Sequence, residues 1–360
     1  MTHGMTGKHW PHEIPAILSR YSRQITLAQI SAVTLHAGFS GAQVWKIGAA
    51  DNAWALRRWP VGALPAARLR GLHALLAHLR QAGLACVAVP VADDMGESLS
   101  FDGTQEWQLE PWLPGRADFQ RDPNPARLSA TMITLAEWHR AVTKFIPTAE
   151  CRTWFASHPA APSPAASERL RTWQREASSV VSTSKIGIPK LPVGELREIG
   201  SELADRVVQL GPRIMDELVP IQHVLLPLQP CLRDIWHDHV LFVDDAVTGL
   251  IDPSACRSEN VATDLARLLG SLVEDDAGAW DAALATYRGI RPLSLAEESL
   301  AVLLDRSAVV LSTLTWLRWL FVEERNFPDR AAVLERLRYL QRRLNHLAGH
   351  ATTTRTRFLT

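Results

Sequence analysis

The sequence predicts an α+β protein in two parts, an antiparallel sheet with one helix followed by a mainly helical region. Three observations lead to this prediction. Several short β-like runs lie within the first 109 residues, and glycine-bearing turns separate the first three of them. Apolar residues recur at helical spacing beyond residues 110–115, a linker with two prolines and a glycine. At 360 residues, the chain also exceeds one typical domain. The predicted parts are residues 1–109, the linker, and residues 116–360.

The N-terminal part is predicted to contain six strands and two helices. Its longer helix, at residues 66–81, carries leucines at helical spacing, and Gly83 suits the end of that helix. In chain order the predicted elements are Glu13–Tyr21, Ile30–Leu35, Gln43–Ile47, Ala53–Trp59, Ala66–Gln81, Cys86–Val91, Ser98–Phe101 and Glu106–Leu109.

The C-terminal part is predicted to be helical apart from one hairpin. Residues 158–166, rich in Pro, Ala and Ser, are predicted to form a surface loop. Gly211-Pro212 is predicted to kink or break its helix. Ser294 and Glu297 fit a capping box before a long apolar helix, whose three charges argue against a membrane span. The predicted helices are Leu128–Val142, Glu168–Val180, Glu195–Leu218, Ala262–Val273, Ala277–Tyr287, Ser299–Val322 and Arg330–Leu347.

Composition limits the classes of partner and compartment. The formal net charge is zero, whereas nucleic-acid binding needs a basic excess, so we expect no nucleic-acid partner. The N-terminal residues contain no apolar signal segment. The scattered cysteines indicate a reduced, cytoplasmic protein without a disulfide framework or structural zinc. These cysteines are Cys86, Cys151, Cys231 and Cys256.

The most informative stretch runs from residue 231 to residue 252, where a polar loop precedes two short apolar runs. Asp234 lies in the loop, and Asp252 ends the second run 18 residues later. The runs Val240–Val243 and Val247–Ile251 are predicted to form a hairpin that holds both acids at one end. Phosphoryl transfer uses such a pair, one carboxylate to orient and deprotonate a hydroxyl and another to hold Mg²⁺ on the nucleotide phosphates.

This stretch resembles the catalytic segment of the aminoglycoside phosphotransferase-like kinases, whose pattern is roughly H-G-D-x-x-x-x-N, a hairpin and G-x-I-D. Here Asp234 is followed by four residues and His239, and the hairpin ends on Gly249-Leu250-Ile251-Asp252. The family's His-Gly pair before the first acid is absent, and its Asn is a histidine. The resemblance covers about residues 37–287 and implies a bilobal protein-kinase-like fold with nucleotide between the lobes.

The resemblance also implies a role for residues of this stretch. It makes Asp234 the catalytic base and Asp252 the Mg²⁺ ligand. His239 stands at the position of a metal-binding Asn. Mg²⁺ prefers oxygen ligands, so three alternatives stay open for His239. It binds Mn²⁺ or another transition ion, it makes a hydrogen bond to a phosphate or to Asp234, or it leaves one metal position to water. Asp264, in a D-L-A element, is expected to brace the catalytic loop.

A glycine-bearing turn lies between the second and third predicted elements of the N-terminal part. Gly38, Ser40 and Gly41 are candidate nucleotide-binding residues, since backbone N–H groups next to glycine can approach triphosphate oxygens closely. The alternative for these residues is a plain turn between strands.

Arg57 takes the place of the phosphate-pairing lysine of the family, and Arg58 is predicted to point to the opposite face of its strand. The helix at residues 66–81 contains no acid, so the usual glutamate partner of this basic residue is missing. Glu110 and Trp112 stand at the hinge, where the resemblance implies that backbone groups meet the adenine edge.

The resemblance implies an ATP-dependent phosphotransferase that uses Mg²⁺, with Mn²⁺ as the alternative ion, and a small-molecule hydroxyl acceptor, with no membrane partner. Acceptor identity and oligomeric state are open. The missing helix acid, the missing His-Gly pair and the Asn-to-His change leave one alternative, a catalytically impaired, pseudokinase-like protein that binds nucleotide.

Overall fold

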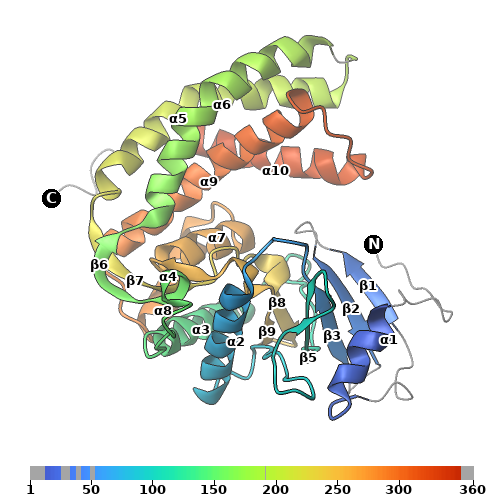
Figure 1. Cartoon of the computed structure of the whole chain (residues 1–360). Coiled ribbons are helices and arrows are strands. Elements are labelled where there is room, and N and C mark those ends of the chain that lie inside the picture. The colour runs from blue at the N-terminus through green and yellow to red at the C-terminus, as the bar shows by residue number, and fades with distance from the viewer. Residues whose placement is uncertain (1–12, 26–32, 38–41, 49–52, 191, 350–360) are drawn as a thin grey trace. The chain divides into compact units, whose positions relative to one another are not determined.

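The structure is a computed structural model that describes residues 13–25, 33–37, 42–48, 53–190 and 192–349 (Figure 1). By its internal contacts the chain forms two compact units. The first comprises Met1–Ala156 and His237–Arg257, and the second comprises Ser157–Trp236 and Ser258–Thr360. The sequence predicts another division, into residues 1–109 and 116–360 joined by a linker at residues 110–115, and this division stays a prediction.

The first unit is built on a five-stranded antiparallel sheet with the strand order β1-β2-β3-β5-β4. Two further strands of this unit, β8 and β9, pair as a hairpin. The strands are β1 (Val33–Ala37), β2 (Gln43–Ile47), β3 (Trp54–Arg58), β4 (Ser100–Phe101), β5 (Glu106–Pro111), β8 (Val240–Val243) and β9 (Ala246–Leu250). The helices are α1 (Glu13–Leu18), α2 (Ala66–Gln81), α3 (Pro125–Val142) and α4 (Arg152–Phe155).

The helix α1 packs its apolar residues against one face of this sheet (Figure 1). Trp45 of β2 and Trp107 of β5 stack there with ring centroids 5.5 Å apart. Arg58 lies over both rings, at 5.4 and 5.3 Å, so it belongs to this face of β3. Because successive side chains of a strand alternate, Arg57 points to the other face, as predicted.

Most predicted elements of this unit are confirmed, and β2, α2 and β8 have the predicted bounds. The strand predicted at residues 86–91 is wrong. Val87 makes only an isolated parallel bridge to Leu250, because no neighbouring strand continues the pairing. Residues 110 and 111 are not linker but the end of β5. Pro111 is tolerated there because it is the last residue of the strand, opposite Trp54.

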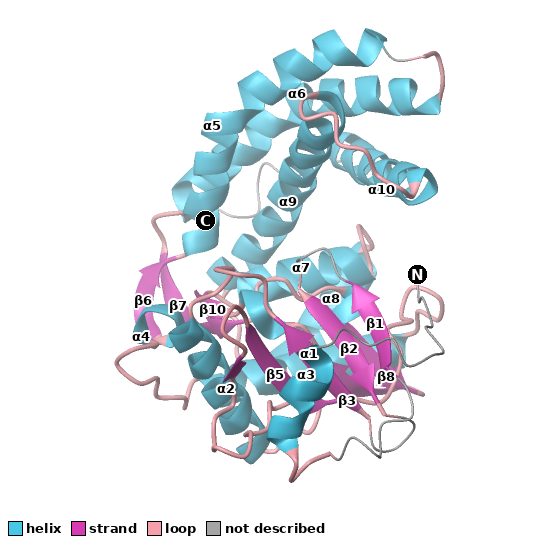
Figure 2. Ribbon diagram, turned by 45° about the vertical axis from the view of Figure 1, so that its right-hand side comes forward, coloured by secondary structure: helices cyan, strands magenta, loops and turns pink. Residues whose placement is uncertain are grey.

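The second unit consists mainly of long helices, with α9 packed against α5, α6, α7 and α10 (Figure 2). The capping box that opens α9 is confirmed, with the Ser294 and Glu297 side chains each accepting from the other's backbone N–H. The elements are β6 (His158–Pro162), α5 (Pro164–Gly187), α6 (Glu195–Ile221), β7 (Leu225–Cys231), β10 (Arg257–Glu259), α7 (Ala262–Leu272), α8 (Ala277–Arg288), α9 (Leu295–Phe321) and α10 (Arg330–Gly349).

Two predictions for this unit are wrong because distant parts of the chain decide the local structure. The loop predicted at residues 158–166 is instead β6 and the start of α5. The partner of β6 is β7, which follows more than 60 residues later and leaves no local signal. Of the kink or break predicted at Gly211-Pro212, the break is absent, since α6 is one helix that contains Pro212 and Pro220, and the kink stays a prediction.

By length and composition alone, α9 is apolar enough to cross a membrane. One such helix among the residues described is weak evidence for a membrane span, because core helices pass the same test. Half of its most apolar window is buried inside the protein. Asp305 of α9 also accepts a 2.6 Å hydrogen bond from Arg343 of α10, which is a feature of a core helix. The four cysteines are all buried and free.

Gly211→Ala is expected to destabilise the protein by about 1–3 kcal/mol, although alanine favours helix formation. A Cβ at this position would clash with the indole ring of Trp173 on α5. It would lie 2.6 and 2.9 Å from two carbons of that ring. The control is Gly278→Ala in α8, whose Cβ would meet its nearest atom at 3.4 Å. Chemical unfolding of both variants checks this; equal stability of the two would contradict the packing argument.

Candidate active site

The β8–β9 hairpin is held in place at its turn. Val243 and Ala246 pair across Asp244-Asp245, and Asp244 has the positive φ of 51° that such short turns favour. The buried Arg127 of α3 donates from Nε to the Asp244 carbonyl oxygen at 3.0 Å. The turn is therefore fixed to α3 by a buried cation.

The open end of the hairpin carries Asp252. The Ile251 N–H donates to the His239 carbonyl oxygen at 3.0 Å, so the backbones of His239 and Asp252 lie at the same end. Asp252 has φ 53° and ψ 59°, in the left-handed region, and it directly precedes Pro253. A proline favours extended conformations in the residue before it, so this conformation is strained. Strain of this kind concentrates at functional sites.

Arg57 lies between two carboxylates. Its Nη1 donates to Asp252 Oδ1 at 3.3 Å, and its Nη2 is 3.8 Å from Glu110 Oε1. The guanidinium also lies over the Trp59 ring, 5.2 Å from its centroid. Arg57 is only 9% exposed, and a buried charge needs such partners. The sheet thus presents one oriented cation next to the strained Asp252.

A chain of hydrogen bonds connects Glu110 to α2. The Gln108 amide donates to Glu110 Oε2 at 2.7 Å, and Gln108 Oε1 accepts from the Trp59 indole at 2.9 Å. His73 of α2 makes a 3.0 Å hydrogen bond to Gln108 Oε1 through Nε2 and a 2.8 Å one to Ser98 Oγ through Nδ1. Since Gln108 Oε1 only accepts, His73 carries its proton on Nε2 and accepts from Ser98.

Burial shifts the pKa values of both ends of this chain. Burial raises the pKa of Glu110; the Arg57 charge and the Gln108 hydrogen bond oppose this rise, and the Asp252 charge adds to it. Burial, together with the charges of Arg57 and Arg70, lowers the pKa of His73 to about 4 against the opposing effect of the Gln108 hydrogen bond. His73 is therefore neutral at pH 7 and serves as a hydrogen-bonding group.

The carboxylate that the α2 sequence lacks is supplied by β5. Sequence reasoning assigned Glu110 to the hinge through its backbone and missed Gln108 and His73. The sequence did carry a signal for them. Gln108 and Glu110 are two residues apart in β5 and therefore share one face of the strand, and Gln108 pairs with Arg57 of β3. The Trp112 N–H donates to the Ala53 carbonyl oxygen at 2.9 Å, so the sheet uses this donor. The predicted residues Gly38, Ser40 and Gly41 lie outside the described residues.

Asp234 belongs to the second unit, whereas Asp252 belongs to the first. That the hairpin holds both acids at one end therefore stays a prediction. Within the second unit, α7 holds the Asp234 loop. The Asp264 carboxylate accepts from the N–H groups of Leu232 and Arg233, at 2.8 and 2.5 Å, which confirms its predicted bracing role. One turn further along α7, Arg267 Nε donates to Asp234 Oδ1 at 3.0 Å.

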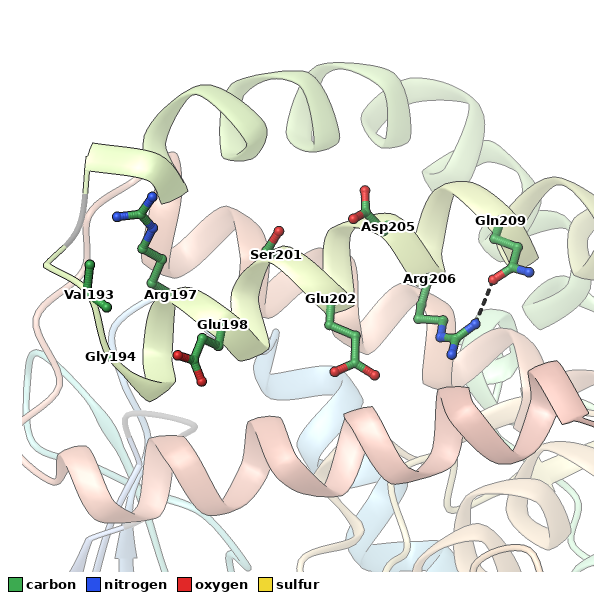
Figure 3. A pocket seen from close by; sticks show the side chains of 9 residues that line it. All are labelled: Val193, Gly194, Arg197, Glu198, Ser201, Glu202, Asp205, Arg206 and Gln209. Atoms are coloured by element: carbon green, nitrogen blue, oxygen red, sulfur yellow. Dashed lines mark hydrogen bonds between the residues drawn. The ribbon is translucent and has the colours of Figure 1, made fainter.

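A groove along α6 is a second candidate site (Figure 3). At about 740 Å³ it is large enough for a small molecule. None of the predicted site residues lines it, and its side chains come from one helix and the turn before it. They are mixed in charge and paired on the surface, as in the 2.8 Å hydrogen bond from Arg206 to Gln209. The groove is a solvated helix face without a group suited to chemistry.

Comparison with known proteins identifies the family. The sequence profile of the phosphotransferase enzyme family matches residues 31–301, about three quarters of the chain. The chain belongs to this family. No curated protein matches it by sequence.

Solved structures of family-like phosphotransferases share the fold. An aminoglycoside phosphotransferase from Alicyclobacillus acidocaldarius is 15% identical, with a TM-score of 0.62 over 96% of this chain and 97% of that one. A spectinomycin phosphotransferase is 12% identical, with a TM-score of 0.61 over 94% and 98%. A microcompartment-associated aminopropanol kinase is 13% identical, with a TM-score of 0.61 over 95% and 97%. At such identities the likeness concerns the fold, and it confirms the predicted kinase-like α+β class.

Within this family member, His73 is expected to make stability depend on pH. In the unfolded chain the histidine binds a proton below its ordinary pKa of 6.5, whereas in the folded protein it does so only near pH 4. The contribution of the neutral His73 to the free energy of unfolding is complete above pH 6.5. As the pH falls toward 4, this free energy decreases by up to about 3 kcal/mol. The difference in free energy of unfolding between wild type and His73→Gln should therefore shrink over this range.

Denaturant titrations at several pH values measure this difference. Ser98→Ala is the control, because it removes one partner of the imidazole but keeps the buried histidine. It should follow the wild-type pH profile. Parallel pH profiles for wild type and His73→Gln would contradict the prediction, because they would mean that His73 has the same pKa in the folded and unfolded states.

Proposed function

We propose that this protein transfers the γ-phosphoryl group of ATP to a hydroxyl group of a small molecule. Membership of the phosphotransferase family supports a small-molecule phosphotransferase. The observation that carries the proposal is the buried Arg57 between Glu110 and the strained Asp252. A metal–nucleotide complex needs this combination of one fixed cation for phosphate and one adjacent carboxylate for a divalent ion.

The residues of the first unit fit a nucleotide with its metal ion. Asp252 offers hard oxygen ligands on a side chain that is 28% exposed, and Arg57 would pair with phosphate oxygens. His239, at the same end of the hairpin, is the proposed second metal ligand, and its imidazole favours Mn²⁺ over Mg²⁺. When bound, the ion would neutralise charge on the transferred phosphoryl group. An amicoumacin kinase of this fold was crystallised with AMP-PNP and Ca²⁺, which supports a nucleotide and a divalent cation.

Other predicted residues complete this part of the proposal. Gly38, Ser40 and Gly41 would approach the phosphates through backbone N–H groups. Trp112 would face the base with its ring or carbonyl group, because its N–H is used in the sheet.

Glu110 is proposed to orient Arg57, in the role that a helix glutamate has in relatives. Hydrogen bonds through the uncharged side chains of Gln108 and His73 link Glu110 to α2, so this helix helps to position the carboxylate that pairs with Arg57.

Asp234 is the proposed general base. In the reaction, the acceptor oxygen forms a bond to the γ-phosphorus as the bond from that phosphorus to the β–γ bridging oxygen breaks. The hydroxyl proton passes to Asp234, and ADP leaves. The Asp264 carboxylate positions the backbone of this loop.

Substitution of the two acids tests the proposal. With ATP, Mg²⁺ or Mn²⁺ and a panel of hydroxyl compounds, wild type should release ADP in an acceptor-dependent manner. Asp234→Asn should lower kcat by about 10²–10⁴ because the base is lost, with nucleotide affinity unchanged. Asp252→Asn should weaken metal-dependent nucleotide binding, measured by calorimetry.

The matched control is Asp281→Asn, at an exposed position of α8, which should behave as wild type. Nucleotide binding without acceptor-dependent ADP release across the panel would favour a binding protein without turnover. Full activity of Asp234→Asn would remove that residue from the proposed chemistry.

Glu110→Gln should raise the Kd for ATP about tenfold, because Arg57 loses one of its two carboxylate partners. Glu106→Gln is the control, since Glu106 lies on the same strand four residues from Glu110. Binding of a fluorescent nucleotide analogue measures both variants. An unchanged Kd in Glu110→Gln, with binding lost in Arg57→Ala, would show that Arg57 acts without Glu110.

A further inference from the structure

The residue before the proposed base adopts a costly conformation. Arg233 has a φ of 65°, and the Asp234 N–H donates to the Leu232 carbonyl oxygen at 2.8 Å across it. This is the rare γ-turn with positive φ, which is strained for a residue with a side chain. The family pattern has glycine here, which adopts such angles freely. An arginine at this position indicates a use for its guanidinium.

The Arg233 side chain is already oriented by a carboxylate. Its Nη2 donates to Glu168 Oε2 of α5 at 2.7 Å. Its buried Nε donates to no acceptor among the described residues. Arg233 therefore retains hydrogen-bonding capacity next to Asp234.

Arg267 places a second cation on Asp234 itself. Besides its 3.0 Å hydrogen bond to Asp234 Oδ1, its guanidinium lies over the Trp236 ring, 5.5 Å from the centroid. The side chains of Arg267 and Asp234 are 34% and 57% exposed, so a ligand can reach both.

A third guanidinium adds to the positive charge. Burial lowers the pKa of Arg169 to about 10; the carboxylates of Asp305 and Glu259 oppose this, and the charges of Arg233 and Arg267 add to it. Arg169 is thus close enough to both Arg233 and Arg267 for their charges to interact, and each of the three arginines also faces a carboxylate.

We propose that the acceptor is an anionic hydroxy compound, with a carboxylate or phosphate group that Arg267 and Arg233 bind beside Asp234. Guanidinium groups bind both anions with paired hydrogen bonds. An acceptor anion that takes the place of the Asp234 carboxylate on Arg267 would leave Asp234 free to receive the hydroxyl proton. This inference rests on the proposed phosphotransferase function.

Acceptors that share a skeleton and differ in charge test the inference. One series is gluconate, glucose 6-phosphate, glucose and glucosamine; the other is glycerate, glycerol phosphate, glycerol and aminopropanediol. ADP release is measured for each with ATP and Mg²⁺ or Mn²⁺. Within at least one series, an anionic member should exceed the neutral and cationic members at least tenfold in kcat/KM. The carboxylate and phosphate members distinguish the two anions.

Arg267→Gln should raise KM for the preferred anion about 10–100-fold, with a much smaller change for the neutral member of the series, and Arg267→Lys should recover part of the loss. Arg288→Gln, an exposed arginine of α8, is the control and should keep the wild-type preference. Preference for neutral or cationic acceptors would overturn the inference. Equal loss for all acceptors in Arg267→Gln would also overturn it, since Arg267 would then only anchor the loop.

The inference and the proposed function fail in different ways. If wild type binds ATP but phosphorylates no anion of either series, the inference is overturned. If wild type does not bind ATP with either metal, as measured by calorimetry, the proposed function itself is overturned.

Discussion

The ion pairing of one buried cation, Arg57, is the constraint on which the candidate nucleotide site depends. A guanidinium removed from water needs carboxylate partners nearby, and these come from β5 and from the end of the β8–β9 hairpin. Each partner is positioned by other contacts. Glu110 is joined through Gln108 to His73 of α2, and the hairpin turn is held by Arg127 of α3. The sheet, α2, α3 and the hairpin therefore all contribute to the position of this one side chain.

The second unit organises the Asp234 loop in a different way. Two side chains of α7, one turn apart, hold it: Asp264 accepts two backbone N–H groups and Arg267 contacts the proposed base. Both candidate acids are also associated with strained backbone. Asp252 itself has a positive φ, and Asp234 follows Arg233, which has one too. Such conformations persist only where surrounding contacts enforce them, as the α7 and hairpin contacts do here.

Two departures from the family pattern change the charged groups at the candidate sites. The acid missing from α2 is supplied by Glu110, from a strand in register with β3. The arginine in place of the family's glycine adds a cation next to Asp234. The family fold hosts acceptors of different chemistry, since its relatives include a spectinomycin phosphotransferase and an aminopropanol kinase. Under the proposed function, acceptor choice would follow from the side chains around Asp234, which include Arg267.

The sequence by itself determined the fold class, the family and the bounds of β2, α2 and β8, because local periodicity and a motif of fixed spacing encode them. It also indicated that Arg57 and Arg58 face opposite ways. Tertiary structure decided what depends on distant partners. Residues 158–162 form a strand only because β7 pairs with them, and α6 continues through Pro212. The partners of Arg57 and Asp234 likewise come from distant segments, and side-chain pairing between such segments leaves no periodic signal in the chain.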